Sequence, residues 1–292
     1  MGSTGSDARR RPLTAPSIRA RKVRDGADPL VMVTAYDAPS GRIADEAGVD
    51  MILVGDSLAM VVLGYDDTLQ VTMDDMVHHT AAVARAKPSA LVVGDLPWMS
   101  YHVDRAETVR NAAALVRAGA GAVKLEGGRK RLGMVEAIID AEIPVMGHIG
   151  LTPQSVRAMG GFKVQGRTSE AAVALVSAAK ALAHAGAFAI VLEAVPDEVA
   201  RMVTDAVDVA TIGIGAGRHC DGQVLVYHDV LGIEERIRPK FVRRYAEQGA
   251  EAISAVGRFA ADVRTGAFPG PDETYHLSAE VAETLGLYGA EA

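Results

Sequence analysis

Eight short apolar segments, separated by longer segments with helical periodicity, constrain the fold of this chain more than any other feature. Runs rich in Val, Ile, Leu and Ala are typical of parallel strands that are buried on both faces. They cover residues 30–35, 51–54, 91–93, 122–125, 144–147, 188–192, 210–214 and 224–227. Because strands and helices alternate without hairpin signals, the pattern predicts a (β/α)8 TIM barrel. An open doubly wound sheet is the alternative.

The segments between the strands have helical patterns. These patterns cover residues 40–47, 72–86, 106–118, 129–141, 169–185 and 198–206. Thr72 is a suitable N-cap, and Asp74 and Asp75 favour a first helical turn there. We expect a short helical lead-in at residues 16–24 and C-terminal helices within 234–264 that pack on the barrel.

One barrel domain accounts for most of the 292 residues. The predicted division is a disordered N-terminus at 1–12, a single (β/α)8 domain at 13–266 and a surface tail at 267–292. The formal net charge of −7 argues against a nucleic-acid partner, and residues 9–11 form only a small basic cluster. No apolar run of 18 residues predicts a membrane segment. The single cysteine, Cys220, favours a reducing compartment, so we expect a soluble cytoplasmic protein.

Polar residues end five successive apolar runs. Asp56, Asp95, Glu126, His148 and Glu193 all stand where a barrel strand would reach its carboxyl end. That rim carries the catalytic residues of TIM-barrel enzymes. Each carboxylate alone could instead cap a helix or pair with an arginine. Three carboxylates brought together repel one another unless a cation lies between them, and oxygen ligands favour Mg²⁺ over zinc.

Two further positions near the rim have chemical potential. Lys124 lies two residues before Glu126 and on the same face of its strand, where it could bind a substrate carboxylate or pair with Glu126. Glu193 ends a strongly apolar run, and burial makes a carboxylate a better base for a C–H proton. A backbone donor could equally satisfy it. The glycine-rich segment 213–217 could bind phosphate or permit close packing of the chain.

Sequence words spread in order over residues 31–232 resemble the ketopantoate hydroxymethyltransferase family. They touch nearly every predicted strand, and the ordered set is specific although no single word is. The words are Val31-Met-Val-Thr-Ala-Tyr-Asp37, Val54-Gly-Asp-Ser-Leu58, Val61-Val-Leu-Gly64, Lys124-Leu-Glu-Gly-Gly128, Gly147-His-Ile-Gly-Leu-Thr-Pro-Gln154, Gly160-Gly-Phe-Lys-Val-Gln-Gly166, Leu192-Glu-Ala-Val-Pro196, Thr211-Ile-Gly-Ile-Gly-Ala-Gly217, Asp221-Gly-Gln-Val-Leu-Val226 and His228-Asp-Val-Leu-Gly232. Ala59 and Gln70 depart from the family pattern, at positions away from the expected ligands.

The resemblance implies a reaction and the residues that carry it. The reaction transfers a hydroxymethyl group from 5,10-methylenetetrahydrofolate to 3-methyl-2-oxobutanoate through a Mg²⁺-stabilised enolate, and gives ketopantoate for pantothenate synthesis. It implies a homo-oligomer, usually a decamer of two stacked pentamers. By matching words, the metal set is Asp56 and Asp95 with Glu126 beside them, and Glu193 is the base. Contacts to the keto acid carry over to Ser57, Asp95, Lys124 and His148.

Two other function classes compete with this interpretation. A metal-enolate barrel of the phosphoenolpyruvate mutase and isocitrate lyase type would share the carboxylates and Mg²⁺, but commonly uses a cysteine on a mobile loop. Cys220 follows the seventh apolar run instead, which disfavours that class. A non-catalytic barrel that binds a keto acid as a sensor would be expected to lack some of the charged rim residues, and none is lacking here.

Overall fold

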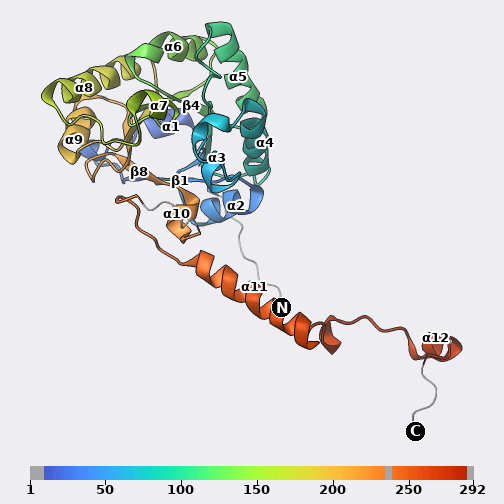
Figure 1. Cartoon of the computed structure of the whole chain (residues 1–292). Coiled ribbons are helices and arrows are strands. Elements are labelled where there is room, and N and C mark those ends of the chain that lie inside the picture. The colour runs from blue at the N-terminus through green and yellow to red at the C-terminus, as the bar shows by residue number, and fades with distance from the viewer. Residues whose placement is uncertain (1–9, 234–238, 288–292) are drawn as a thin grey trace.

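Eight parallel strands close into one barrel in chain order, with helices around it (Figure 1). The computed structural model describes residues 10–233 and 239–287. The strands are β1 Leu30–Thr34, β2 Met51–Val54, β3 Leu91–Asp95, β4 Ala122–Glu126, β5 Val145–Gly150, β6 Ala189–Glu193, β7 Ala210–Ile214 and β8 Gly222–Leu225. Strand β1 pairs with both β2 and β8, so the barrel is closed and the open-sheet alternative is wrong.

The apolar runs are continuous because alternate strand residues enter two different cores. One core fills the barrel interior and includes Leu53, Val93 and Val191. The other lies between the strands and the surrounding helices and includes Ile52 and Val92. Since successive side chains of a strand point to opposite faces, both sets must be apolar when both faces are buried.

The main covering helices agree with the predicted segments to within about three residues at each end. They are α2 Ala38–Glu46, α4 Met73–Ala84, α5 Arg105–Arg117, α6 Leu132–Asp140, α8 Ser169–His184 and α9 Asp197–Ala206. Thr72 caps α4 as expected, because its side chain accepts the backbone N–H of Asp75. Asp104 and Thr168 cap α5 and α8 in the same way.

The N-terminal lead-in is shorter than predicted and is broken in the middle. Helix α1 spans Ala15–Arg19, and the 3-10 turn η1 follows at Val23–Asp25. Lys22 adopts an extended conformation between them, because its ammonium group turns inward to the buried carboxylate of Asp221 at 2.6 Å. Ala15 and Ile18 of α1 join the interior core, so this segment closes one end of the barrel.

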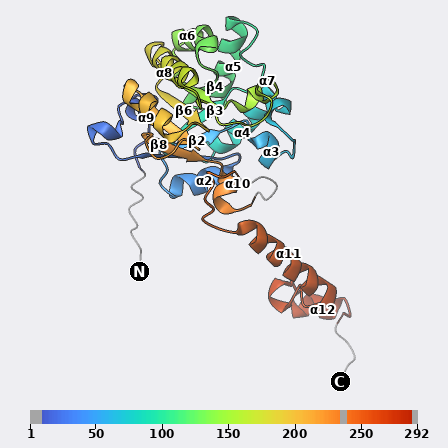
Figure 2. The ribbon, with the colours of Figure 1, turned by 60° about the vertical axis from the view of Figure 1, so that its left-hand side comes forward.

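The prediction that the C-terminal helices pack on the barrel is wrong. Helix α11, Gln248–Thr265, projects away from the barrel, and the short helix α12, Ala279–Thr284, lies beyond it (Figures 1 and 2). The apolar side chains of α11 are consequently exposed, Ile253 to 72% and Phe259 to 53%. Residues 1–9 and 288–292 lie outside the described residues, and the predicted division into terminus, barrel and tail stays a prediction.

Short helices that the sequence patterns did not predict line the carboxyl-terminal rim of the barrel. They are α3 Leu58–Val61, α7 Val156–Met159 and α10 Tyr227–Leu231, with the 3-10 turns η2 Thr68–Gln70 and η4 Pro153–Ser155. The turn η3 Arg129–Arg131 lies within the predicted helical segment 129–141, and a further turn, η5 Pro271–Glu273, lies in the tail. Elements of four or five residues are too short to show a helical period. No helix within residues 10–233 and 239–287 is long and apolar enough to cross a membrane.

Candidate active site

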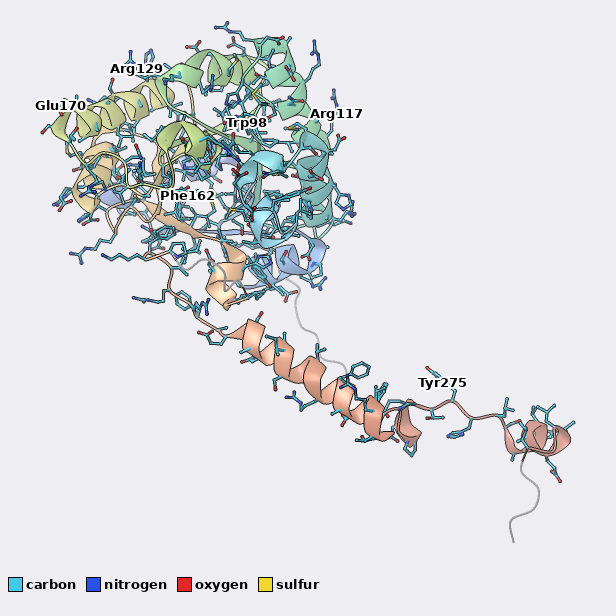
Figure 3. All side chains as sticks on the ribbon, in the orientation of Figure 1. Trp98, Arg117, Arg129, Phe162, Glu170 and Tyr275 are labelled. Atoms are coloured by element: carbon cyan, nitrogen blue, oxygen red, sulfur yellow. The ribbon has the colours of Figure 1, made fainter. Side chains whose placement is uncertain are left out.

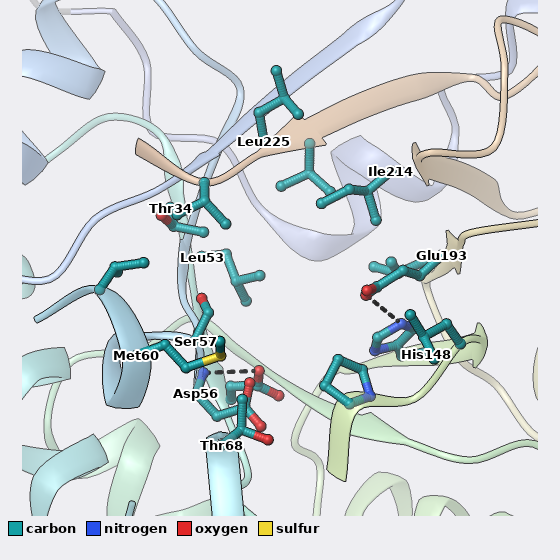
Figure 4. Close-up of a pocket in the computed structure, with 18 of the residues that line it drawn as sticks. Thr34, Leu53, Asp56, Ser57, Met60, Thr68, His148, Glu193, Ile214 and Leu225 are labelled. Carbon is teal, nitrogen blue, oxygen red and sulfur yellow. Dashed lines mark hydrogen bonds and ion pairs between the residues drawn. The ribbon is translucent and has the colours of Figure 1, made fainter. Parts of the chain in front are cut away.

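A cavity of about 500 Å³ opens at the carboxyl ends of the strands (Figure 4). Its floor is formed by interior-core side chains, among them Leu53, Val191 and Val224. Its mouth includes Phe162, which stands exposed on the face of the barrel (Figure 3). The cavity therefore lies at the end of the barrel where TIM-barrel enzymes have their active sites.

All seven residues predicted to form the site line this one cavity. They are Asp56, Ser57, Asp95, Lys124, Glu126, His148 and Glu193. The strand register explains this convergence, because Asp95 pairs with Lys124 and Glu126 pairs with His148 in neighbouring strands. The structure thus confirms where these residues lie, while their individual roles remain predictions.

Asp56 and Asp95 are neighbouring carboxylates in the wall of the cavity. The backbone N–H of Asp56 donates to Asp95 Oδ2 at 3.2 Å, and both side chains are buried. The pKa of Asp56 lies well above its usual range because burial disfavours the charged form and Asp95 and Glu126 repel it. Burial also raises the pKa of Asp95, although Lys124 opposes this. The surrounding protein therefore disfavours the charged forms of both carboxylates, and a bound cation would favour them.

Lys124 is paired with Asp95 rather than with Glu126. Its Nζ lies 2.8 Å from Asp95 Oδ1 and 3.4 Å from His148 Nδ1. Burial favours the neutral amine, but the carboxylates Asp95, Glu126 and Asp56 outweigh it, so the pKa of Lys124 is raised. Lys124 is therefore a fixed positive charge at the cavity wall.

His148 lies between two carboxylates. Its Nε2 is 3.2 Å from Glu193 Oε2, and its Nδ1 is 3.5 Å from Glu126 Oε1. Burial and Lys124 lower the pKa of His148, but the two glutamates outweigh them and raise it to about 9. The pKa of Glu126 is lowered because His148, Lys124 and the N–H of Gln154 outweigh its burial. The imidazole is consequently a cation at neutral pH.

Glu193 is the most exposed of the four predicted site carboxylates, with 16% of its side chain exposed. Figure 4 shows Glu193 and His148 on one side of the cavity, facing Asp56 and Ser57 across it. A small molecule held at Asp56 could therefore present a proton to Glu193, which is the geometry that a general base needs.

Sequence reasoning missed three buried polar residues that hold the site residues in place. Tyr36 shares a hydrogen bond of 2.9 Å with the Ser57 hydroxyl. Gln154 and Tyr101 contact Asp56 and Glu126 from behind the cavity wall. Tyr36 and Gln154 lie within the sequence words that resemble the family. Their side chains are uncharged, so a search for charged residues at strand ends does not select them.

The glycine-rich segment serves close packing. Gly215 and Gly217 have φ angles of +63° and +74°, which favour glycine. A side chain at Gly217 would collide with Asp197, whose Oδ1 accepts the N–H of Arg218 at 3.1 Å. Because a carboxylate already occupies this turn, the close-packing alternative is favoured over a phosphate site.

The donor set at the rim fits a hard divalent cation. Asp56 and Asp95 are adjacent and buried, and both have a raised pKa, a sign of negative charge that a cation would offset. In the part of the chain that the structure describes, no three His, Cys, Asp or Glu side chains are arranged to hold an ion by themselves. Mg²⁺ does not need three, since it is commonly bound by one or two carboxylates together with water or substrate oxygens.

Sequence comparisons place relatives along nearly the whole chain. A family model described as ketopantoate hydroxymethyltransferase matches residues 13–271. A 3-methyl-2-oxobutanoate hydroxymethyltransferase from Koribacter versatilis is 54% identical over 259 residues, 88% of each chain. A protein of the same name from Ignicoccus hospitalis is 58% identical over 250 residues, 86% of this chain and 94% of the relative.

Solved structures with the same fold are far more distant in sequence. Phosphonopyruvate hydrolase in complex with oxalate and Mg²⁺ has a TM-score of 0.57 at 15% identity and covers 94% of this chain and 95% of its own. Oxaloacetate acetylhydrolase in complex with 3,3-difluorooxalacetate has a TM-score of 0.58 at 15% identity, with 95% of each chain covered. At this identity the likeness shows the barrel fold alone.

Proposed function

Because the chain belongs to the ketopantoate hydroxymethyltransferase family and is therefore a transferase, we propose that it acts on 3-methyl-2-oxobutanoate. The hydroxymethyl group comes from 5,10-methylenetetrahydrofolate, and the product is ketopantoate, the first intermediate of pantothenate synthesis. The observation that carries the proposal is one cavity that holds a carboxylate pair, two cations and a facing carboxylate. These are the groups needed to bind a keto acid and remove its C3 proton.

In this proposal Asp56 and Asp95 hold Mg²⁺. When bound there, the ion supplies Lewis-acid chemistry that polarises the keto oxygen of the substrate. Glu126 lies beside the pair, with His148 near one of its oxygens and the N–H of Gln154 donating to the other. The raised pKa of Asp56 and the buried position of both aspartates support this assignment.

Lys124 and His148 bind the negatively charged end of the keto acid. Both are buried cations at the cavity wall, so they can offset charge on the carboxylate and on the oxygen that becomes negative during the reaction. Ser57 orients the substrate with its hydroxyl, whose position is fixed by Tyr36. Burial matters here because water would weaken each of these interactions.

Glu193 removes the C3 proton. The enolate carbon then forms the new bond to the methylene carbon that the folate delivers. Water supplies the hydroxyl group as the carbon–nitrogen bonds between that methylene and the folate break, and tetrahydrofolate leaves. His148 lies 3.2 Å from the Glu193 carboxylate and is positively charged. This ion pair holds the Glu193 carboxylate in position before proton transfer. The Glu193 carboxylate is more exposed than those of Asp95 and Glu126, which suits a group that must reach the C3 proton.

The proposal is tested by product formation. Wild-type protein is incubated with 3-methyl-2-oxobutanoate, 5,10-methylenetetrahydrofolate and Mg²⁺, and ketopantoate is measured by mass spectrometry. Parallel samples lack folate or contain a chelator. Product in the complete mixture alone supports the proposal. No product in any sample would mean that the barrel acts on another substrate or is a binding scaffold.

We also propose that the chain assembles as a homo-oligomer, for which the resemblance implies a decamer. The exposed apolar side chains of α11 support this, because Ile253, Val256 and Phe259 would be an unfavourable surface for a monomer in water. Light scattering after size exclusion gives the subunit number. A particle of 30.5 kDa would rule assembly out. The expected cytoplasmic location stays a prediction.

A further inference from the structure

Gln154 joins the ends of three neighbouring strands behind the cavity. It lies in the turn η4, and only 4% of the residue is exposed. Its side-chain Nε2 donates to Asp56 Oδ2 at 2.9 Å and to the carbonyl oxygen of Leu96 at 3.0 Å. Its backbone N–H donates to Glu126 Oε2 at 3.0 Å. One residue thus contacts groups that follow β2 and β3 and the carboxylate that ends β4.

Tyr101 completes this arrangement from the loop after β3. Its hydroxyl donates to Gln154 Oε1 at 2.6 Å and accepts the backbone N–H of Glu126 at 3.2 Å. The residue is 1% exposed, and Arg131 stacks over its ring with the guanidinium carbon 6.0 Å from the centroid. Every side-chain hydrogen-bonding atom of Gln154 and Tyr101 is therefore used, as a buried polar network requires.

The contacts also determine which way the amide of Gln154 points. Nε2 faces a carboxylate oxygen and a carbonyl oxygen, which can only accept, while Oε1 faces a hydroxyl that can donate. The reversed amide would place an acceptor against two acceptors. A glutamate at this position would bring a further negative charge next to Asp56, where two carboxylates already repel it. A neutral donor is the chemistry that the position needs.

Neither side chain is among the described residues that line the cavity, so both lie behind its wall. What both can do is fix the carboxylates that face it. Gln154 holds one oxygen of Asp56 and one of Glu126, which prevents either side chain from rotating. The second oxygen of Asp56 is then directed by that contact.

We infer that Gln154 and Tyr101 are positioning residues that set the orientation of Asp56, and hence the affinity of the rim for Mg²⁺. The inference rests on the proposed metal site and deepens it. Residues that hold metal ligands from behind typically contribute about 10- to 100-fold in metal affinity. Gln154 acts on Asp56 directly, and Tyr101 acts on it through the amide of Gln154.

The test measures Mg²⁺ binding by isothermal titration calorimetry in the absence of substrate. The variant Gln154→Met keeps the length of the side chain but removes its donor and acceptor. It should bind Mg²⁺ about 10- to 100-fold more weakly than the wild type. Tyr101→Phe removes one hydroxyl and keeps the ring, and should weaken binding about threefold, the equivalent of one hydrogen bond. The double variant should bind no more weakly than Gln154→Met, since Tyr101 acts through Gln154.

Thr204→Val is the matched control. Thr204 is buried and shares a hydrogen bond of 2.8 Å with Thr211, which lies at the start of β7, at the opposite end of the barrel. This variant also loses a buried hydrogen bond, but its Mg²⁺ affinity should equal that of the wild type. A purely structural role for Gln154 and Tyr101 would lower thermal stability in all three single variants and leave every Mg²⁺ affinity unchanged.

Two results overturn the inference. If Gln154→Met is folded and binds Mg²⁺ as the wild type does, Gln154 does not position the metal site. If Gln154→Met does not fold, Tyr101→Phe decides, and unchanged affinity in that variant rejects the inference. Failure of the proposed metal site itself is distinguishable, because the wild type and the Thr204→Val control would then show no Mg²⁺ binding either.

Discussion

Buried carboxylates occur at both ends of the barrel, but only those at the amino-terminal end have a matching partner for each charge. There, Asp221 accepts the Lys22 ammonium at 2.6 Å together with the backbone N–H groups of Val23 and Thr211. Asp50 is contacted by two arginines, Arg10 at 2.8 Å and Arg21 at 2.7 Å. Both buried aspartates at this end of the barrel are therefore ion-paired with cationic side chains.

At the carboxyl-terminal rim, two cations, Lys124 and His148, are shared by four carboxylates, Asp56, Asp95, Glu126 and Glu193. Asp56 and Asp95 have a raised pKa, largely because of burial, whereas the pKa of Asp50 is lowered by Val31 and its arginines despite its burial. An unfavourable arrangement of charge persists in a stable fold when it serves binding or catalysis. We infer that the amino-terminal end mainly stabilises the fold, whereas the carboxyl-terminal rim carries the chemistry.

The largest expected effect tests the stabilising end. Lys22→Met leaves Asp221 buried without its cation and should lower the free energy of unfolding by about 3–5 kcal/mol. Chemical denaturation measures this. Turnover of the folded protein should stay at the wild-type value, because Lys22 is far from the rim. Arg24→Met is the matched control, since Arg24 pairs with the exposed Asp208 and its loss should cost no more than about 1 kcal/mol.

A pair of aspartate variants tests the comparison from both ends. Asp95→Ala removes a proposed ligand and should weaken Mg²⁺ binding by about 100-fold or more, beyond the range for residues behind a ligand. Asp50→Ala removes a buried, ion-paired aspartate from the other end and should leave Mg²⁺ affinity unchanged. Calorimetric titration compares them. Equal Mg²⁺ affinities in the two variants would contradict the proposal that Mg²⁺ binds at the rim through Asp95.

Glu193→Gln separates chemistry from binding within the rim. The amide keeps the shape of the side chain but cannot accept the C3 proton, so turnover should fall by about 100-fold or more. Binding of Mg²⁺ and of the keto acid should persist, because Asp56, Asp95 and Lys124 are untouched. Steady-state kinetics and calorimetry supply both readouts. Wild-type turnover in this variant would remove Glu193 from the role of base.

The smallest expected effect is a pH dependence of stability at the rim. The pKa of His148 is raised from 6.5 to about 9 in the folded protein, so the charged imidazole stabilises the fold. That contribution is fully present below pH 6.5, the unfolded value, and is lost as the pH rises through about 9. Denaturation of the wild type in chelator should therefore show stability falling over this window.

The matching measurement uses His148→Gln, which should have a shallower slope than the wild type. Part of the slope should remain, because the raised pKa of Asp56 also makes stability fall as the pH rises. At the amino-terminal end, the pKa of Asp50 is lowered, so this group is charged throughout the range and adds no slope. If His148→Gln keeps the wild-type slope, the loss of stability comes from another group and the charge assigned to His148 is wrong.

The sequence predicted the barrel well because the strand signal is redundant. Each strand must be apolar on both faces, so runs such as residues 51–54 are recognisable without any tertiary information. The same logic located the rim, since Asp56 and Asp95 interrupt apolar runs where the strands end. The short rim helices and the break at Lys22 escaped prediction, because tertiary contacts rather than local periodicity determine them.

The placement of α11 could not be predicted for a related reason. Its amphipathic pattern predicts that another surface covers the apolar face of the helix, but the pattern does not identify that surface. Gln154 shows the same limit at the site. An amide in a loop becomes informative only when Asp56, Leu96 and Tyr101 are found around it.

Exchange of the C3 proton of 3-methyl-2-oxobutanoate in D₂O shows directly whether this rim generates an enolate. Proton NMR follows the signal with the protein, Mg²⁺ and tetrahydrofolate, beside a chelated sample and the Glu193→Gln variant. We expect the C3 proton signal to be lost, and we expect this loss to require both the metal and Glu193. Persistence of the signal at the rate of the chelated sample would contradict the claim that this rim generates an enolate.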